Sequence, residues 1–111
     1  METRIQKTIS QWFPDAFADV KRSVIATDYG ILQQFALYTK KLIENDSENK
    51  KEPFKIIFLL YSKGSLFEKN AIENEFLNVL ATEEKSGTIK DHLDLMPEAL
   101  RPVYIKTILE N

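Results

Sequence analysis

The stretch that decides the fold is Pro53–Gly64, PFKIIFLLYSKG, near the middle of this 111-residue chain. Between residues 54 and 61 only Lys55 is not apolar. Pro53 suits the first turn of a helix, and Gly64 suits the left-handed position that ends one. A run this apolar in a small protein has to be buried. It therefore predicts a core helix that begins near Pro53 and ends near Gly64.

A buried strand is the alternative for the same run, because periodicity alone does not separate a continuous apolar strand from a buried helix. A strand needs partners, and a lone one is not stable. The only candidate partners are residues 23–27 and 103–108, and both lie within good helical patterns. We therefore favour the helix.

A capping box follows the run directly. Ser65 can accept a hydrogen bond from the backbone N–H of Glu68, whose side chain can reach back to the backbone N–H of Ser65. A second helix is therefore expected from Ser65 to about Ala81, and the two helices form a tight hairpin. Further helical patterns are predicted up to Trp12, at Phe17, Val20 and Val24, from Tyr29 to Glu44 with Asp28 as the N-cap, from Ile89 to just before Pro97, and from Pro97 onward.

Together these elements predict an all-α fold, a compact bundle or stack of helical hairpins with six to seven helices. We expect one domain over residues 1–111, because a chain of this length can bury one core but not two. The helix at 53–64 is expected at the centre, with the helices at 29–44 and 65–81 packed on it. Residues 45–52 and 83–88 are expected to form loops.

Composition excludes several classes of function. Lys and Arg total 15 against 17 Asp and Glu, which gives a net charge of -2 without a basic stripe, so nucleic-acid binding is disfavoured. The chain has no cysteine, which excludes disulfides and thiolate chemistry. No signal-peptide pattern or membrane-spanning run is visible, so we expect neither secretion nor membrane insertion and a cytoplasmic location.

Patterns for catalysis or metal binding are nearly absent. The single histidine, His92, lies among aspartates and is expected to be a partly exposed surface residue. The serines and glycines form no nucleophile elbow and no phosphate-binding loop. A carboxylate site shared by Glu68, Glu75 and Asp91 is a remote alternative. We therefore predict no catalytic, cofactor-binding or metal-binding residues, no cofactor and no enzymatic activity.

Two surface features point instead to contacts with a partner. Asparagines recur every four residues along the helix predicted at 65–81, opposite its apolar stripe, and each costs roughly half a kcal/mol of helix propensity relative to alanine. A compensating contact with a neighbouring helix or another protein is plausible. Two leucines also project among polar residues. The candidate interface residues are Asn70, Asn74, Asn78, Leu37 and Leu59.

The segment NAIENEFLNVL at 70–80, preceded by IIFLLYSKGS and followed by LMPEALRPVY, resembles a family of small uncharacterised helical proteins of bacteria. The likeness covers about the last two thirds of the chain, together with Phe13-Pro14. It implies a compact stack of helix pairs, and some small bacterial proteins of this kind are immunity proteins that neutralise toxins. The resemblance carries over no catalytic or binding residue.

Three hypotheses of function follow. The first is a protein-interaction module, with an immunity-type role as its narrowest form. The second is a helical protein that binds a small ligand or a metal in a cavity under the aromatic core near Tyr29, Tyr38, Tyr61 and Tyr104. The third is a structural subunit that associates with its own copies. The expected partner is thus another protein or a second copy, with no nucleic acid and no membrane.

Overall fold

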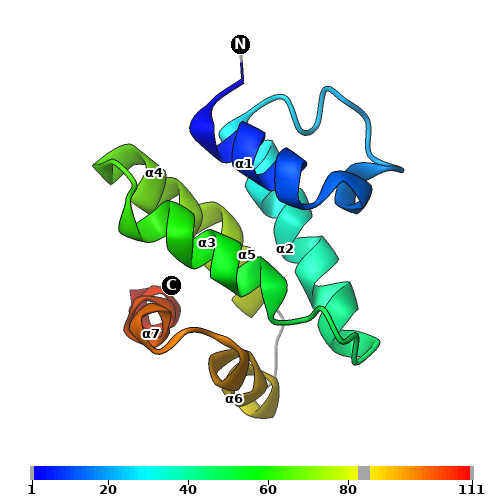
Figure 1. The fold of residues 1–111 in the computed structure, drawn as a ribbon. Helices are drawn as coiled ribbons and strands as arrows, with labels where there is room; N and C mark the ends of the chain where they lie inside the picture. Colours follow the sequence, from blue (N-terminus) through cyan, green and yellow to red (C-terminus); the bar gives the residue numbers. More distant parts are fainter. Residues whose placement is uncertain (1, 83–85, 111) are drawn as a thin grey trace.

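The chain folds into helices joined by short connections, as a computed structural model that describes residues 2–82 and 86–110 shows (Figure 1). No strand occurs among these residues, so the all-α prediction is confirmed and the strand alternative at 54–61 is wrong. The elements are α1 (Arg4–Trp12), η1 (Pro14–Phe17), α2 (Asp28–Glu44), α3 (Glu52–Ser62), α4 (Leu66–Ala71), η2 (Ile72–Leu77), α5 (Asn78–Ala81), α6 (Ser86–Leu95), η3 (Glu98–Leu100) and α7 (Arg101–Glu110).

The decisive stretch forms α3, a core helix as predicted. Phe54, Ile57 and Leu60 are fully buried, and the Phe54 ring meets Phe76 edge to face at a centroid distance of 6.3 Å. Burial of each such side chain contributes roughly 1.5–3 kcal/mol before the entropy cost of ordering it. Leu59, between these positions, remains exposed.

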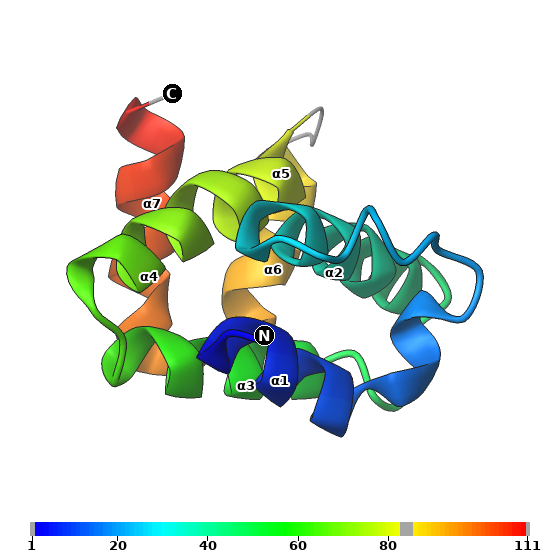
Figure 2. The same ribbon diagram turned by 90° about the horizontal axis from the view of Figure 1, so that it is seen from above.

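The centre of the fold, however, is the helix that follows α3. It runs from α4 through η2, whose turns are π-helical, into α5 without a break. It packs against α2 on one side and α7 on the other, while α3 contacts α1 and α4. The prediction that α3 would be central was therefore wrong. The fully buried residues Ile72, Phe76, Leu77 and Leu80 explain why, because they place the long helix between its neighbours (Figures 1 and 2).

The turn between α3 and α4 contains the predicted capping box but not the predicted left-handed glycine. Ser65 accepts from the Glu68 N–H at 3.2 Å, and the Glu68 carboxylate accepts from the Ser65 N–H at 2.8 Å. Gly64 does not adopt a positive φ. It is required for space, since a Cβ there would lie 2.7 Å from the Leu60 carbonyl oxygen and 3.3 Å from the Arg4 guanidinium.

The helix predicted at Phe17, Val20 and Val24 is absent. After η1 the chain proceeds through turns to Thr27. Thr27, not Asp28, caps α2, because its hydroxyl accepts from the Gly30 N–H at 3.0 Å. These turns lie directly on α2, where a Cβ at Gly30 would come within 1.8 Å of the Val24 carbonyl oxygen. The missing Cβ therefore allows the chain to cross the helix.

The connections were predicted unevenly. Residues 45–51 form the expected link, and Asp46 adopts a φ of 49° as α2 ends. Of the loop predicted at 83–88, residues 86–88 belong to α6, and residues 83–85 lie outside the described residues. The last predicted helix begins with the 3-10 turn η3 and continues as α7, with Pro102 in its first turn as expected.

Candidate protein-interaction surface

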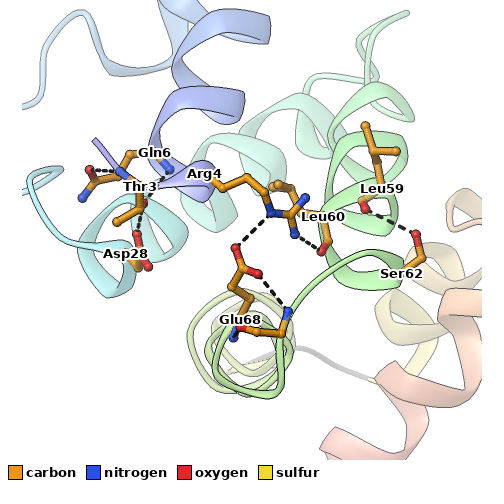
Figure 3. Close-up of polar contacts among 9 residues, drawn as sticks. Thr3, Arg4, Gln6, Asp28, Leu59, Leu60, Ser62 and Glu68 are labelled. Carbon is orange, nitrogen blue, oxygen red and sulfur yellow. Dashed lines mark hydrogen bonds and ion pairs between the residues drawn. The ribbon is translucent and has the colours of Figure 1, made fainter. Parts of the chain in front are cut away.

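Two of the five predicted interface residues are leucines on different helices. Leu37 on α2 is 44% exposed and Leu59 on α3 is 41% exposed. Figure 3 shows the Leu59 side chain directed away from the polar contacts at the start of α4. Only Leu37 lines one of the surface hollows described below. The structure therefore confirms that both leucines are exposed, and it places Leu37 at the wall of a hollow.

The asparagines lie along the central helix, opposite its buried side chains. Asn70 and Asn74 are exposed, and Asn78 is half-buried. Their side-chain amides form no hydrogen bond with any residue that the structure describes. A neighbouring helix therefore does not compensate for their low propensity, and a contact with a partner stays a prediction.

Two adjoining hollows open where α1 and α2 end and α3 begins. Figure 2 shows how these helix ends lie together. The first, the Trp12 hollow, has a volume of about 460 Å³; the second, the Leu37 hollow, has about 370 Å³. Asp15 and Tyr38 line both, and we call the two together the open groove. The Trp12 hollow is lined by Trp12, Phe13, Pro14, Asp15, Tyr38, Asn49, Glu52, Lys55 and Ile56. The Leu37 hollow is lined by Asp15, Ala16, Ala18, Asp19, Val20, Gln34, Leu37, Tyr38, Lys40, Lys41 and Glu44.

Aromatic packing fixes the shape of the open groove. Pro14 ends α1 and turns the chain, which places the Phe13 ring 4.9 Å from Phe35 and 6.1 Å from Tyr38 between centroids. Tyr38 stacks on Phe35 at 6.2 Å with an interplanar angle of 13°. Phe35 is fully buried, so the floor of the groove, formed by Phe13 and Tyr38, packs directly on the core. A rigid base of this kind is typical of preformed binding sites.

Trp12 is the functional candidate that the sequence reasoning missed. Trp12 follows Ile5 and Ile9 at helical spacing, and both isoleucines are fully buried, but Trp12 is 62% exposed. The difference arises because α1 ends at Trp12 and no described element covers its last turn on that side. A large aromatic residue directly before Phe13-Pro14, at a predicted helix end, was the available signal.

The charges of the Trp12 hollow are only partly paired. The Glu52 carboxylate accepts from Lys55 at 3.2 Å, an exposed pair within one helix turn. The Asp15 carboxylate has no ion pair and no hydrogen bond among residues 2–82 and 86–110. The hollow therefore carries one carboxylate whose charge no described residue neutralises.

The opposite end of α3 is closed by a polar cluster (Figure 3). The Arg4 guanidinium donates to the Glu68 carboxylate at 3.0 Å and to the Leu60 carbonyl at 2.7 Å. Burial would raise the pKa of Glu68, but the hydrogen bonds from Ser65 and Arg4 outweigh it and lower that pKa below its ordinary value. Arg4 thereby joins α1, α3 and α4.

The start of α1 is fastened to the start of α2 and to the residues before it by two further contacts, of which Figure 3 shows the one between Thr3 and Asp28. The Thr3 hydroxyl donates to the Asp28 carboxylate. The Gln6 side-chain amide donates to the Ala26 carbonyl at 2.7 Å. Gln6 also completes a capping box with Thr3. These contacts favour a structural role for this region.

Glu73, in the π-helical turns, gathers a second polar cluster. It accepts from the Tyr61 hydroxyl at 2.7 Å and from Lys106 of α7 at 3.5 Å. Lys69 lies over the Tyr61 ring at 5.5 Å. Burial and the Glu73 carboxylate raise the pKa of Tyr61 to about 12, so its hydroxyl stays protonated and serves as a donor. The cluster holds α3, η2 and α7 together.

His92 is buried, and its prediction as a surface residue was wrong. It is 1% exposed, and its Nδ1 lies 2.9 Å from the Tyr104 hydroxyl of α7. The reason is that α6 packs its His92 side against α7, which residue type and acidic neighbours did not reveal. His92 thus joins two helices from within the core.

The remote carboxylate site is absent. Glu68 pairs with Arg4, and Glu75 accepts from Gln33 at 2.6 Å. Among the described residues, no group of three or more His, Cys, Asp or Glu side chains is arranged to hold a metal ion. Glu68, Glu75 and Asp91 therefore do not converge.

The four tyrosines of the ligand hypothesis have different neighbours. Tyr29 lies 6.1 Å from Phe67, Tyr38 belongs to the open groove, Tyr61 contacts Glu73, and Tyr104 contacts His92. Tyr29 is exposed and Tyr104 is buried, while Tyr38 and Tyr61 are half-buried.

Two other exposed apolar patches lie outside the open groove. Leu66 and Phe67 at the start of α4 neighbour Tyr29, and Ile105 and Leu109 follow the outer side of α7. The hollow beside Ile105 and Leu109 is lined only by η3 and α7, so no second element bounds it. The open groove differs because α1, η1, α2 and α3 all contribute to it.

Comparison with known proteins identifies a family whose function is unknown. A family model described as a domain of unknown function, DUF7674, matches residues 7–110. No curated protein and no solved structure matches the chain. In the described part of the chain, no helix has the length and apolar character needed to cross a membrane.

Proposed function

We propose that this chain, which belongs to the DUF7674 family of domains of unknown function, is a non-enzymatic cytoplasmic module that binds another protein through the open groove. The match confirms the resemblance to a family of uncharacterised helical domains. It supplies no activity, so the proposal is based on the surface.

The observation that carries the proposal is the exposure of Trp12 and Leu37 beside a rigid aromatic floor. Trp12 is 62% exposed and Leu37 44% exposed, and the floor continues into Phe35 of the core. Aromatic residues dominate the binding energy of protein interfaces, particularly where a pocket surrounds them. A partner side chain that entered the groove would bury apolar surface without requiring the groove to reorganise.

Site-specific photo-cross-linking in the native host tests the proposal. A photoreactive benzoylphenylalanine at Leu37 would lie in the groove, and the same residue at Ile105 is a matched control, since both positions are 44% exposed. We expect a discrete cross-linked protein from position 37 and none from position 105. Equal products at both positions, or none at either, would contradict the proposal.

A third cross-linking position separates the groove from the asparagine stripe. Asn74 is exposed on the central helix and does not line the groove. A product from position 74 but not from position 37 would move the interface to the stripe of Asn70, Asn74 and Asn78. A product of twice the chain mass at position 37 would favour self-association.

The narrowest form of the proposal is an immunity-type role, in which the partner is a toxin and the contact blocks its action. Its support is the resemblance of residues 70–80 and their flanking segments to small helical proteins. Expression of a neighbouring toxin gene with and without this chain tests it. Equal toxicity in both cases would exclude this form and leave the broader proposal standing.

A further inference from the structure

We propose that the Trp12 hollow binds a basic side chain, arginine or lysine, presented by the partner protein. The inference rests on the proposed function and specifies the chemistry of the partner. It starts from the combination, in one preformed hollow, of the exposed Trp12 ring and the half-buried Phe13 and Tyr38 rings with a carboxylate that no described residue neutralises.

The aromatic groups come from α1, from the residue that follows it and from α2. Trp12 ends α1, Phe13 follows it, and Tyr38 lies on α2. The Phe13 and Tyr38 rings meet at 66°, so the two rings do not stack on each other face to face. A cation over an aromatic face gains roughly 0.5–2 kcal/mol, and tryptophan is the most favourable ring.

The carboxylates decide between occupants of different charge. An anionic side chain would meet Asp15 and Glu52, both of which line the hollow. An apolar side chain would remove water from the Asp15 carboxylate without replacing it by a partner, which is unfavourable. Lys55 of the same hollow is already paired with Glu52 at 3.2 Å. A basic side chain of the partner would supply a charge-assisted hydrogen bond to the Asp15 carboxylate.

The second hollow indicates what accompanies the basic residue. Asp15 and Tyr38 line both hollows, so a segment bound at Asp15 passes directly into the surroundings of Leu37. Leu37 and Val20 offer apolar contacts there. The partner segment therefore carries an apolar residue close to its basic one, and a free small cation would use only half of the groove.

Selection of random linear peptides displayed on phage tests this inference on the full chain. Peptides that also bind a Trp12→Ala variant are removed. We expect the remaining peptides to be enriched in arginine or lysine next to an apolar residue. Enriched peptides that lack basic residues would overturn the inference but leave the proposed function intact, whereas no enrichment, together with no cross-link at position 37, would overturn both.

Calorimetric titration of the best peptide supplies the charge test. Asp15→Asn is expected to weaken binding by about tenfold or more, because it removes a charge-assisted contact. Asp94→Asn, at an exposed position of α6, is the matched control and is expected to leave the affinity unchanged. Replacement of the peptide arginine by citrulline should cost as much as Asp15→Asn, and the two changes together should cost little more than either alone. Equal binding by Asp15→Asn and the unchanged chain would overturn the inference.

Discussion

The two ends of α3 are held in different ways. At its C-terminal end Leu60 is fully buried, and its carbonyl accepts from Arg4, which also pairs with Glu68. At its N-terminal end Glu52 lies beside the exposed Trp12, and its only ion pair among the described residues is with Lys55 of the same helix. The polar groups at the first end are paired within the chain, whereas the Asp15 carboxylate at the second end has no partner among the described residues. The closed end therefore contributes stability, and the open end is available for binding.

The largest expected effect on the free energy of unfolding comes from replacing one large side chain at each end of α3 by alanine. Leu60→Ala should lower the free energy of unfolding by about 2–5 kcal/mol, since it leaves a cavity in the core. Trp12→Ala should change it by less than about 0.5 kcal/mol, although it removes a larger side chain, because Trp12 is mostly exposed. Urea unfolding followed by far-UV circular dichroism measures both.

Leu59→Ala is the control for the Leu60 substitution, because Leu59 occupies the next position of the same helix but is exposed. We expect it to cost less than about 0.5 kcal/mol. A loss from Trp12→Ala as large as that from Leu60→Ala would show that both ends stabilise the fold, and the comparison would fail.

A smaller effect is expected from crowding the closed end. Gly64→Ala should destabilise the chain by about 1–3 kcal/mol, because its Cβ would lie 2.7 Å from a backbone oxygen that cannot move without shifting the helix end. The φ of Gly64 is not positive, so backbone strain is not the cause. The unfolding midpoint in urea measures the loss.

Ser62→Ala is the neighbouring control for the glycine, since Ser62 is exposed and its hydroxyl bonds only the Leu59 carbonyl, at 3.3 Å. Its expected effect is within about 0.5 kcal/mol. If Gly64→Ala proved neutral, the close approach of Arg4 and α4 to this turn would not be required for stability.

The smallest effect depends on pH. Glu68→Gln removes the ion pair with Arg4 but keeps a side chain that can complete the capping box, so the cost at pH 7 should be about 0.5–1 kcal/mol. The folded pKa of Glu68 is lowered, so its stabilising contribution is present above the unfolded pKa and is lost as the pH falls through the folded value. The difference between the two chains should therefore shrink as the pH falls below about 4.5, the ordinary value for glutamate, and through the lowered folded pKa.

Urea unfolding at several pH values provides the measurement, with Glu52→Gln as the counterpart at the open end. That substitution disrupts an exposed pair within one helix and should cost less than Glu68→Gln at pH 7. A difference for Glu68→Gln that stays constant with pH would mean that the ionised carboxyl is not its source.

Local sequence rules predicted the closed end better than the open one. The apolar run and the Ser65–Glu68 capping box are local signals, and both are present as predicted. Arg4 contacts Leu60 and Glu68 from a distant part of the sequence, so no local rule could place it there. The capping box thus identified the turn, but not the residue that fastens it.

The open end depends on where helices stop relative to one another, which spacing does not encode. Periodicity grouped Trp12 with Ile5 and Ile9, although only the isoleucines are covered. The exposure of Leu37 followed correctly from its polar neighbours, whereas its position beside Asp15 and Tyr38 required the fold. His92 was misplaced for the same reason, because its burial depends on the packing of α6 against α7.

The exposure of Trp12 has a practical spectroscopic consequence. It is the only tryptophan of the chain, and it is already mostly in water in the folded state. Its fluorescence should therefore change little when the chain unfolds and more when a ligand covers the ring. Trp12 emission should therefore report poorly on unfolding, but it should allow binding in the groove to be followed without an added label.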